Sequence, residues 1–362
     1  EIGSGLVGSE MCIRDRFIIA LREVYKMKIK ISDIAKKAGV SDGTVSNALN
    51  NRKGISNEKR EYILQIAREM GYFRKNSDQD KLIRLLIVNK QAHVVGDTPF
   101  FSELIRGIET ECSGQGFELV INHVDAEILK NRRLEDILKT DQTSGILLLG
   151  TEMEVQDLNY FRNICIPLVV LDTAFRDTNF DYVAINNVDG TYEIVEHLIK
   201  NGHTSIGIIN SSHQINNFRE RKNGYVHALN DNNLLLSPEN EALVEPTPEG
   251  AYLDMKAFLN SFLAEFPKEK LPTAFYAVND NIALGAIKAF NELDLSISIC
   301  GFDDLPICEL ITPALTTVHV NKQYLGKTAV SRLVQKINTP DYDIQKILIA
   351  TKTIQRDSVK KR

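Results

Sequence analysis

Short apolar runs alternate with helical stretches along the whole chain after Leu82. Runs of this length have the size of buried strands, and strands separated by helices predict βαβ units with parallel sheets. Residues 82–362 are numerous enough for two such lobes, so the expected body is a two-lobed α/β module. The expected strands are Ile83–Val88, Phe117–Asn122, Gly145–Leu149, Leu168–Leu171, Ser205–Ile209, Thr273–Val278 and Ile297–Gly301, and the helices between them include Glu103–Gly114, Thr191–Lys200 and Ile282–Glu292.

Residues 27–75 predict a different unit, made of three short helices. Ser32 and Ser41 are expected N-caps of the first two helices, and Gly39 is expected to end the first because glycine adopts positive φ without strain. A third helix is expected from about Ser56 to Met70. Two short helices joined by a tight turn with glycine are typical of a helix-turn-helix, whose second helix enters the DNA major groove. A plain three-helix cap is the alternative, which the order of cap, glycine and cap disfavours.

Charge separates this head from the rest of the chain. Residues 27–75 hold eleven Lys and Arg against five Asp and Glu, which gives this segment a net charge of +6. Residues 1–26 have no net charge. Residues 76–362 therefore have a net charge of −11, because the whole chain has −5. A basic head on an acidic body indicates a polyanionic partner for the head alone. The polar residues expected to point outward from the second helix are Asp42, Gly43, Thr44, Ser46 and Asn47, and Thr44, Ser46 and Asn47 are suited to bind phosphates or base edges.

Polar side chains follow several expected strands of the body. Asp172, Asn279-Asp280 and Asp303-Asp304 come directly after apolar runs. Ligands of open α/β sheets bind beyond the carboxyl ends of the strands, and carboxylates with amides suit a sugar, whose hydroxyls both donate and accept. Arg221 adds donors, and Phe100-Phe101 adds aromatic faces for stacking. Each residue also has a duller explanation, as a helix cap, a surface charge or part of the core.

Several classes of function are disfavoured. No GxSxG, P-loop or HExxH motif is present, and the seven histidines lack metal-ligand spacing, so we expect no enzyme activity, no metal and no cofactor. No CxxC spacing relates Cys112, Cys165, Cys300 and Cys308, which are expected to be buried, reduced thiols of a cytoplasmic protein. No apolar run approaches the roughly 18 residues of a membrane span, so no membrane partner is expected.

Residues 1–26 stand apart from both units. Glu10-Met-Cys-Ile-Arg-Asp-Arg16 looks like the translation of a sequencing adapter, so we expect this segment to be a non-native extension or assembly artefact and Met27 to be the biological start. A signal peptide is the alternative, but Phe17–Leu21 is shorter than the usual apolar core of about 7–15 residues and no small-residue cleavage site follows.

The motifs of both units resemble the lactose/galactose repressor (LacI/GalR) family. The matching residues are Asp33–Ser41, Thr44–Ser46 and Leu49-Asn50 in the head, and Val169–Asp172, Asn186–Gly190, Asn279-Asp280, Gly301–Asp304 and Thr312–Thr317 in the body. The resemblance covers nearly all of residues 27–357, in family order. It implies a sequence-specific transcriptional regulator, expected to be a repressor, with a periplasmic-binding-protein-like body that binds a small-molecule effector, a sugar or sugar phosphate. It also implies a homodimer that binds a double-stranded DNA operator.

The resemblance also implies the site residues. Those expected to bind DNA are Lys30, Ser41, Asp42, Gly43, Thr44, Ser46, Asn47, Asn50 and Arg52, with Asp42, Gly43 and Asn47 at the base-reading positions. Those expected to bind effector are Phe100, Phe101, Asp172, Arg221, Asn279 and Asp303. The expected domains are the helix-turn-helix of residues 27–75, a short linker of residues 76–81 and the effector-binding and dimerisation body of residues 82–362.

Two alternatives remain open at this point. The linker is polar and lacks the apolar wedge of the family's hinge helix, so it is either a flexible tether or a hinge that does not wedge into DNA. The runner-up function is a solute (sugar)-binding receptor of the transport type. That class predicts an export signal and no DNA-binding head. The helix-turn-helix expected in residues Met27–Tyr72 disfavours it.

Overall fold

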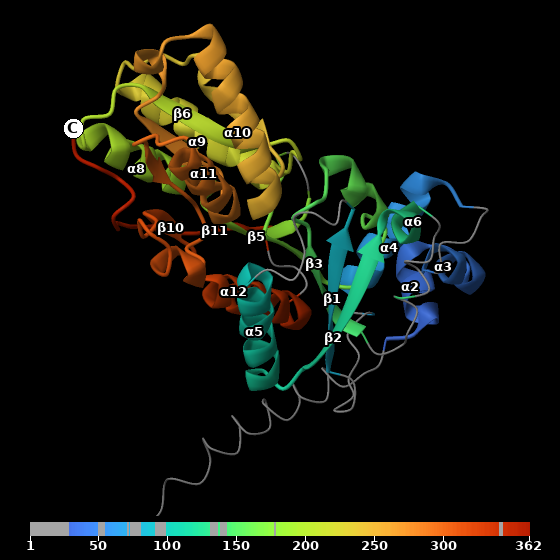
Figure 1. The fold of residues 1–362 in the computed structure, drawn as a ribbon. Helices are drawn as coiled ribbons and strands as arrows, with labels where there is room; N and C mark the ends of the chain where they lie inside the picture. Colours follow the sequence, from blue (N-terminus) through green and yellow to red (C-terminus); the bar gives the residue numbers. More distant parts are fainter. Residues whose placement is uncertain are drawn as a thin grey trace, which may run out of the picture. The chain divides into compact units, whose positions relative to one another are not determined.

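The structure is a computed structural model, which describes residues 29–49, 55–70, 72, 81–90, 99–130, 137, 143–176, 179–339 and 343–362. The chain divides into two compact units, one of residues 1–80 with 336–342 and one of residues 81–335 with 343–362. The first unit contains a helical head with its own apolar core. The second unit is a larger α/β body (Figure 1).

The head consists of α2 (Ile31–Ala38), α3 (Asp42–Leu49) and α4 (Asn57–Glu69). Gly39 ends α2 in the left-handed conformation with φ 66°, and the Ser41 hydroxyl accepts the Thr44 N–H at 3.2 Å, so both expected turn residues are confirmed. The expected cap at Ser32 is wrong. The helix already begins at Ile31, because the Asp33 carboxylate accepts the Lys30 N–H at 2.8 Å and thereby satisfies the first turn.

The first lobe of the body contains a six-stranded sheet in which every pair of neighbouring strands is parallel. Its strands in spatial order are β2 (Glu118–Asp125), β1 (Leu82–Asn89), β3 (Thr143–Leu149), β4 (Leu168–Leu171), β5 (Asp181–Ile185) and β11 (Lys346–Ile349). The associated helices are α5 (Pro99–Gly114), α6 (Ala126–Lys130), the 3-10 helix η1 (Val155–Tyr160) and α12 (Lys322–Asn338). The order places β1 and β3 at a topological switch point, where ligands of such sheets bind.

The second lobe contains a four-stranded parallel sheet and a two-stranded antiparallel sheet. The parallel strands in spatial order are β7 (Glu241–Val244), β6 (Ile206–Ser211), β8 (Ala274–Ala277) and β9 (Ser298–Cys300), and the antiparallel pair is β10 (Thr317–His319) with β12 (Lys352–Ile354). The helices are α8 (Asn187–Lys200), α9 (Asn216–Asp231), α10 (Pro248–Glu265) and α11 (Asp280–Glu292), with 3-10 turns η2 (Pro238–Asn240), η3 (Lys268–Lys270) and η4 (Pro306–Glu309). The predicted α/β body with parallel sheets is confirmed.

The chain passes between the lobes three times, after β5, after β10 and after β11. These crossings return α12 and β11 to the first lobe, where α12 lies beside α5 (Figure 1). The Arg332 guanidinium of α12 donates from Nε to Asp181 Oδ1 at 2.7 Å, and both side chains are buried. This ion pair connects α12 to the first residue of β5.

The remaining sequence expectations concern thiols, metals and membranes. Cys112, Cys300 and Cys308 are buried free thiols, as expected, whereas Cys165 is only partly buried. Within the described ranges, no group of His, Cys, Asp and Glu side chains is arranged to hold a metal ion. None of the helices described has the length and apolar character needed to cross a bilayer.

The crossing of α5 and α12 generates a testable prediction. A Cβ atom at Gly107 would lie 2.2 Å from the Gln323 carbonyl oxygen. This oxygen belongs to the backbone, so the clash can be relieved only by moving one of the two helices. Gly107→Ala is therefore expected to destabilise the body by about 1–3 kcal/mol, because the two helices must separate. Gly114→Ala on the same helix is the matched control, since its Cβ would meet nothing within 4 Å. Equal urea midpoints for the two variants would contradict this account of the crossing.

Candidate functional site

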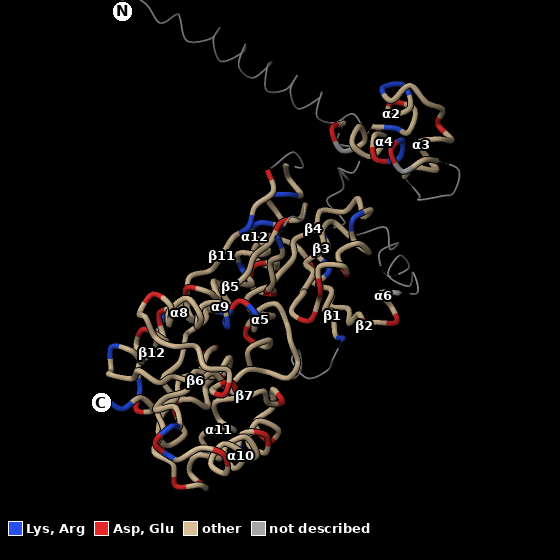
Figure 2. Tube along the Cα trace, turned by 90° about the horizontal axis from the view of Figure 1, so that it is seen from above, with Lys and Arg blue, Asp and Glu red and all other residues tan. Residues whose placement is uncertain are grey.

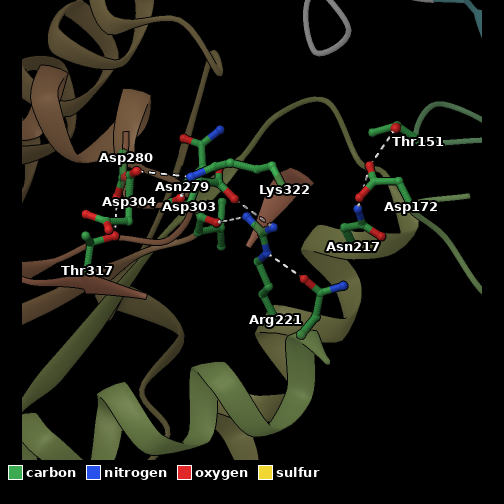
Figure 3. Close-up of polar contacts among 12 residues, drawn as sticks. Thr151, Asp172, Asn217, Arg221, Asn279, Asp280, Asp303, Asp304, Thr317 and Lys322 are labelled. Carbon is green, nitrogen blue, oxygen red and sulfur yellow. Dashed lines mark hydrogen bonds and ion pairs between the residues drawn. The ribbon is translucent and has the colours of Figure 1, made fainter. Parts of the chain in front are cut away.

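Arg221 of α9 is the centre of a buried polar network in the second lobe (Figure 3). Its side chain is 3% exposed and lies over the Phe302 ring, with the guanidinium carbon 3.7 Å from the ring centroid. Nε donates to Asn187 Oδ1 at 2.9 Å, Nη1 donates to the Val278 carbonyl at 2.8 Å and Nη2 donates to Asp303 Oδ1 at 3.1 Å. These bonds use three of the five N–H groups of the guanidinium, so two can still face a ligand.

Asp303 belongs to a turn that is held from both sides. Its backbone φ is 112° and that of Asp304 is 53°, both in a region that non-glycine residues rarely adopt. Lys322, at the start of α12, donates from Nζ to the carbonyl oxygens of both residues, at 3.0 Å for Asp304. Burial raises the pKa of the Asp303 carboxyl, and the charges of Arg221 and Lys322 oppose that rise. The Phe100 ring of α5 lies 5.9 Å from the Lys322 ammonium, which brings the first lobe to the same place.

Asp172 follows β4 of the first lobe and is 1% exposed. Its Oδ2 accepts the Thr151 hydroxyl at 2.6 Å and Asn217 Nδ2 at 3.4 Å, and the second of these bonds joins the two lobes. Its Oδ1 has no hydrogen-bond partner among the residues that the structure describes. Burial raises the pKa of Asp172 to about 7, because the two hydrogen bonds and the charge of Arg221 offset only part of the desolvation.

Asp172 Oδ1 is one of four buried oxygens without a partner at this edge of the first sheet. The other three are Asn89 Oδ1 at the end of β1, Thr173 Oγ1 beside Asp172, and Asn217 Oδ1 on the facing helix α9. A buried polar atom without a hydrogen bond costs roughly 1–3 kcal/mol, and such atoms are rare in folded proteins. All four can accept a hydrogen bond, so a ligand rich in donor groups would satisfy them.

The structure brings Asp172, Arg221 and Asp303, three of the six predicted effector residues, close together. The other three are Phe100, Phe101 and Asn279. The charges of Arg221 and Asp303 both act on Asp172. Phe100 and Phe101 are each 7% exposed and form an edge-to-face pair with centroids 5.0 Å apart. The Asn279 side chain accepts the Ile282 N–H at 2.9 Å, so its oxygen caps α11.

Four members of the network were not among the residues predicted to bind effector, for different reasons. Thr151 follows β3 and obeys the same strand-end rule that found Asp172. Asn217 lies four positions before Arg221 and thus on the same helix face, so the helical period could have found it. Asn187 lies in the motif Asn186–Gly190 that carries the family resemblance, but it was not predicted to bind effector. Lys322 joins the network only because the chain crosses between the lobes, and no local pattern marks it.

A pocket of about 340 Å³ adjoins this network, with Lys322 in its wall. Residues of both lobes and of the crossing between β10 and α12 line it. They are Pro99, Glu103, Asp304, Leu305, Pro306, His319, Val320, Asn321, Lys322 and Gln323.

The head presents the predicted DNA-binding residues mostly on its surface. Val45 and Ala48 bury one face of α3, whereas Ser41, Asp42 and Gly43 are exposed and Thr44, Ser46 and Asn47 are partly exposed. Lys30 is exposed before α2, and Figure 2 marks the basic residues of the head in blue. The predicted contacts Asn50 and Arg52 lie outside the described residues.

The buried carboxyl of Asp172 generates a prediction about pH. Its pKa is about 7 in the folded chain against an ordinary 3.8, so the folded state holds this proton more tightly. The resulting stability is complete below pH 4 and is lost as the pH rises through about 7. Asp172→Asn, a neutral isostere, is therefore expected to be more stable than the natural chain by up to roughly 4 kcal/mol at pH 8 and by far less at pH 5. Urea unfolding at both pH values measures the difference, and a difference independent of pH would contradict the assignment.

Comparison with known proteins gives matches over both units. A family model described as bacterial regulatory proteins, lacI family, matches residues 30–75, and a periplasmic binding protein-like domain model matches residues 195–359. The HTH-type transcriptional repressor PurR of Haemophilus influenzae (strain ATCC 51907 / DSM 11121 / KW20 / Rd) is 32% identical over 345 residues, which cover 91% of this chain and 98% of the relative. PurR of Actinobacillus pleuropneumoniae serotype 5b (strain L20) is 30% identical over 341 residues, with 91% and 98% covered.

Solved structures share the fold. The complex of the transcriptional regulator CelR with cellobiose matches with a TM-score of 0.68 at 22% identity and covers 91% of this chain and 99% of its own. The lac repressor dimer bound to operator and the anti-inducer ONPF matches with a TM-score of 0.65 at 23% identity, with 92% and 100% covered. A LacI family regulator from Enterococcus faecium with bound ribose matches with a TM-score of 0.64 at 23% identity, with 78% and 100% covered.

The head, the body and their order along the chain all agree with these relatives. Identity of 30% or more extends over nine-tenths of the chain and nearly the full length of the repressors. The chain therefore belongs to the lacI family of bacterial regulatory proteins and is an effector-controlled, DNA-binding transcriptional regulator, not an enzyme.

Proposed function

We propose that the effector is a neutral sugar or a similar polyhydroxylated molecule bound between the two lobes. The observation that carries this proposal is a group of four buried acceptor oxygens, Asp172 Oδ1 and three others, that have no partner among the described residues. Sugar hydroxyls donate to such oxygens, whereas a phosphate offers mainly acceptors and a negative charge that Asp172 and Asp303 would repel. The structures with cellobiose and ribose support the same class of ligand. The proposed contact residues are Phe100, Phe101, Thr151, Asp172, Asn217, Arg221, Asn279 and Asp303.

Ligand binding at this place acts on the contacts between the lobes. The first turns of α9 touch the first lobe through Asn217 and Asp172, through Asn216 Nδ2 and the Ala174 carbonyl at 3.2 Å, and through the Arg219–Glu154 ion pair at 3.1 Å. A ligand that bonds Asp172 and Asn217 changes the balance of these contacts and so the population of lobe arrangements. A coupling of ~1–3 kcal/mol to the head would change operator affinity ~5–150-fold.

The proposed partner of the head is a double-stranded operator. Two chains paired as a homodimer present two heads, which suits a pseudo-palindromic site, and one matching structure is a dimer bound to operator. The names of the PurR relatives support repression as the mode of action.

The proposed division of the chain is a head of residues 27–75, a linker of residues 76–81 and a body of residues 82–362, with residues 1–26 as a non-native extension. The proposed location of the protein is the cytoplasm. The transport-type receptor is not favoured, because the matching relatives are repressors that carry the same head.

The test is an operator-binding titration with the full chain and duplexes from upstream of its own coding sequence. We expect binding that weakens steeply with salt and changes ~5–150-fold in the presence of one member of a neutral sugar panel. Binding that no sugar changes would overturn the proposed effector class. A response to sugar phosphates but not to the parent sugars would overturn the preference for a neutral ligand.

Asn217→Ala provides a sharper probe of the effector site. The variant removes one of the four acceptor oxygens and a bond to Asp172, so we expect the effector Kd to rise about 5–30-fold, equivalent to about 1–2 kcal/mol. The operator Kd without effector is measured as well, because loss of the Asn217–Asp172 bond between the lobes itself acts on the lobe arrangement. Calorimetric titration of effector and anisotropy titration of operator measure the two values.

Asn223→Ala is the matched control, since Asn223 is exposed on the same helix. Equal effector affinities for the Asn217 and Asn223 variants would exclude Asn217 from the site. Arg221→Ala is expected to abolish the effector response as well. That variant also leaves the buried Asp303 carboxylate without its ion pair, so its folding must be verified first.

A further inference from the structure

Lys322 connects a helix of the first lobe to a turn of the second lobe. It is the first residue of α12, and the start of this helix packs closely on α5, because a Cβ atom at Gly326 would lie 2.5 Å from the Leu104 carbonyl oxygen. From this fixed position Lys322 Nζ donates to the carbonyl oxygens of Asp303 and Asp304, in the turn after β9 (Figure 3). The side chain therefore spans the two lobes.

The burial of this ammonium group costs free energy. Lys322 is 8% exposed, and among the described residues no carboxylate lies within ion-pair distance of its Nζ. Lysine is rarely buried unless it is paired, because its charge must leave water. The partners of Nζ here are the two carbonyl oxygens and the Phe100 ring, whose centroid is 5.9 Å away. An apolar side chain of similar size would fill the same space at lower cost, so the charge is explained by the turn that it holds.

The turn has a backbone conformation that needs support. The backbone φ is 112° at Asp303 and 53° at Asp304, and such conformations persist where the surrounding contacts over-determine them. Within the second lobe, the Leu305 N–H donates to Asp280 Oδ2 at 2.9 Å. Among the hydrogen bonds of the described residues, those of Lys322 are the ones that reach the turn from a first-lobe helix. Support of the turn thus depends on the position of that helix.

The direction of the Asp303 carboxylate depends on this turn. Asp303 Oδ1 accepts Arg221 Nη2 at 3.1 Å, whereas the carboxylate of Asp304 is bonded to His319 at 2.8 Å and to Arg356 at 2.8 Å. The two neighbouring carboxylates therefore have separate sets of partners. Rotation of the second lobe relative to α12 pulls on two carbonyl oxygens of the turn, and so changes the peptide units that orient both side chains.

We propose that Lys322 is a positioning residue that couples the arrangement of the two lobes to the orientation of Asp303. The proposal rests on the proposed effector site, which includes Asp303, and it adds a connection between that site and lobe movement. Asp303 is directed towards Arg221 while Lys322 spans the lobes, and it loses that orientation when the lobes move apart. Effector and lobe arrangement then act on each other through this side chain as well as through α9.

The first test needs no effector and measures hydrogen exchange of the Leu305 amide in the full chain by mass spectrometry. Asn217→Ala removes the bond to Asp172 and loosens the contact between the lobes. In the natural chain this change is expected to speed exchange at Leu305 about 5-fold, because lobe movement reaches the turn through Lys322. In Lys322→Met, exchange is expected to be faster from the outset, and Asn217→Ala is expected to add nothing.

Two further variants of the same position support this measurement. Lys322→Arg keeps the charge, and the adjoining pocket of about 340 Å³ has room for the larger head group, so the effect of Asn217→Ala on exchange is expected to remain. Lys322→Gln removes the charge and is the replacement should Lys322→Met not fold, with the same loss of that effect expected. Lys327→Met, at a partly exposed position of α12, is the matched control and is expected to behave as the natural chain.

The second test is operator titration with the sugar that changes operator binding most in a neutral panel containing ribose and cellobiose. The response of Lys322→Met is expected to be at least about 5-fold smaller than that of the natural chain, whereas Lys327→Met keeps the full response. Additive effects of the Lys322 and Asn217 changes on exchange, or a full operator response in Lys322→Met, would overturn the proposal. The expected exchange pattern in a chain that answers to no sugar would support the role of Lys322 and instead overturn the proposed effector class.

Discussion

The burial of the Asp172 carboxyl between the lobes is the interaction on which the proposed effector site depends. Among the described residues, one oxygen is bonded to Thr151 and Asn217, and the other has no hydrogen-bond partner. The parallel strands of the first lobe and α9 of the second position both oxygens. A ligand that donates a hydrogen bond to the unpartnered oxygen would act on both lobes at once.

Successive turns of helix α9 contact different lobes. Asn217 and Arg219 contact the first lobe, whereas Arg221, one turn beyond Asn217, is bonded entirely within the second lobe. The Arg221–Asp303 pair and the Phe302 ring keep the helix rigidly attached to its own lobe. A change at the first turn would therefore act on the second lobe as a whole.

Much of this organisation follows from local sequence pattern, and the exceptions have physical causes. The strand Leu168–Leu171 is a purely apolar run, so both its bounds and the polar residue after it were predictable. The strand β5 was not predicted, because it begins with a charged residue, Asp181. This charge can be buried because Arg332, 151 positions later in the chain, pairs with it. A similar long-range cause hid Lys322, which reaches the carbonyl oxygens of Asp303 and Asp304 from α12. Ser32 was misassigned as a cap because the helix begins earlier, at Ile31, where the Asp33 carboxylate accepts the Lys30 N–H.

The most direct test of the account is the reciprocity of its two binding equilibria. Linkage requires that effector change the operator Kd by the same factor by which operator changes the effector Kd. The account predicts equal ratios of ~5–150 from titrations of each ligand in the absence and presence of saturating amounts of the other. An effector that binds between the lobes with the same Kd whether or not operator is bound would contradict it.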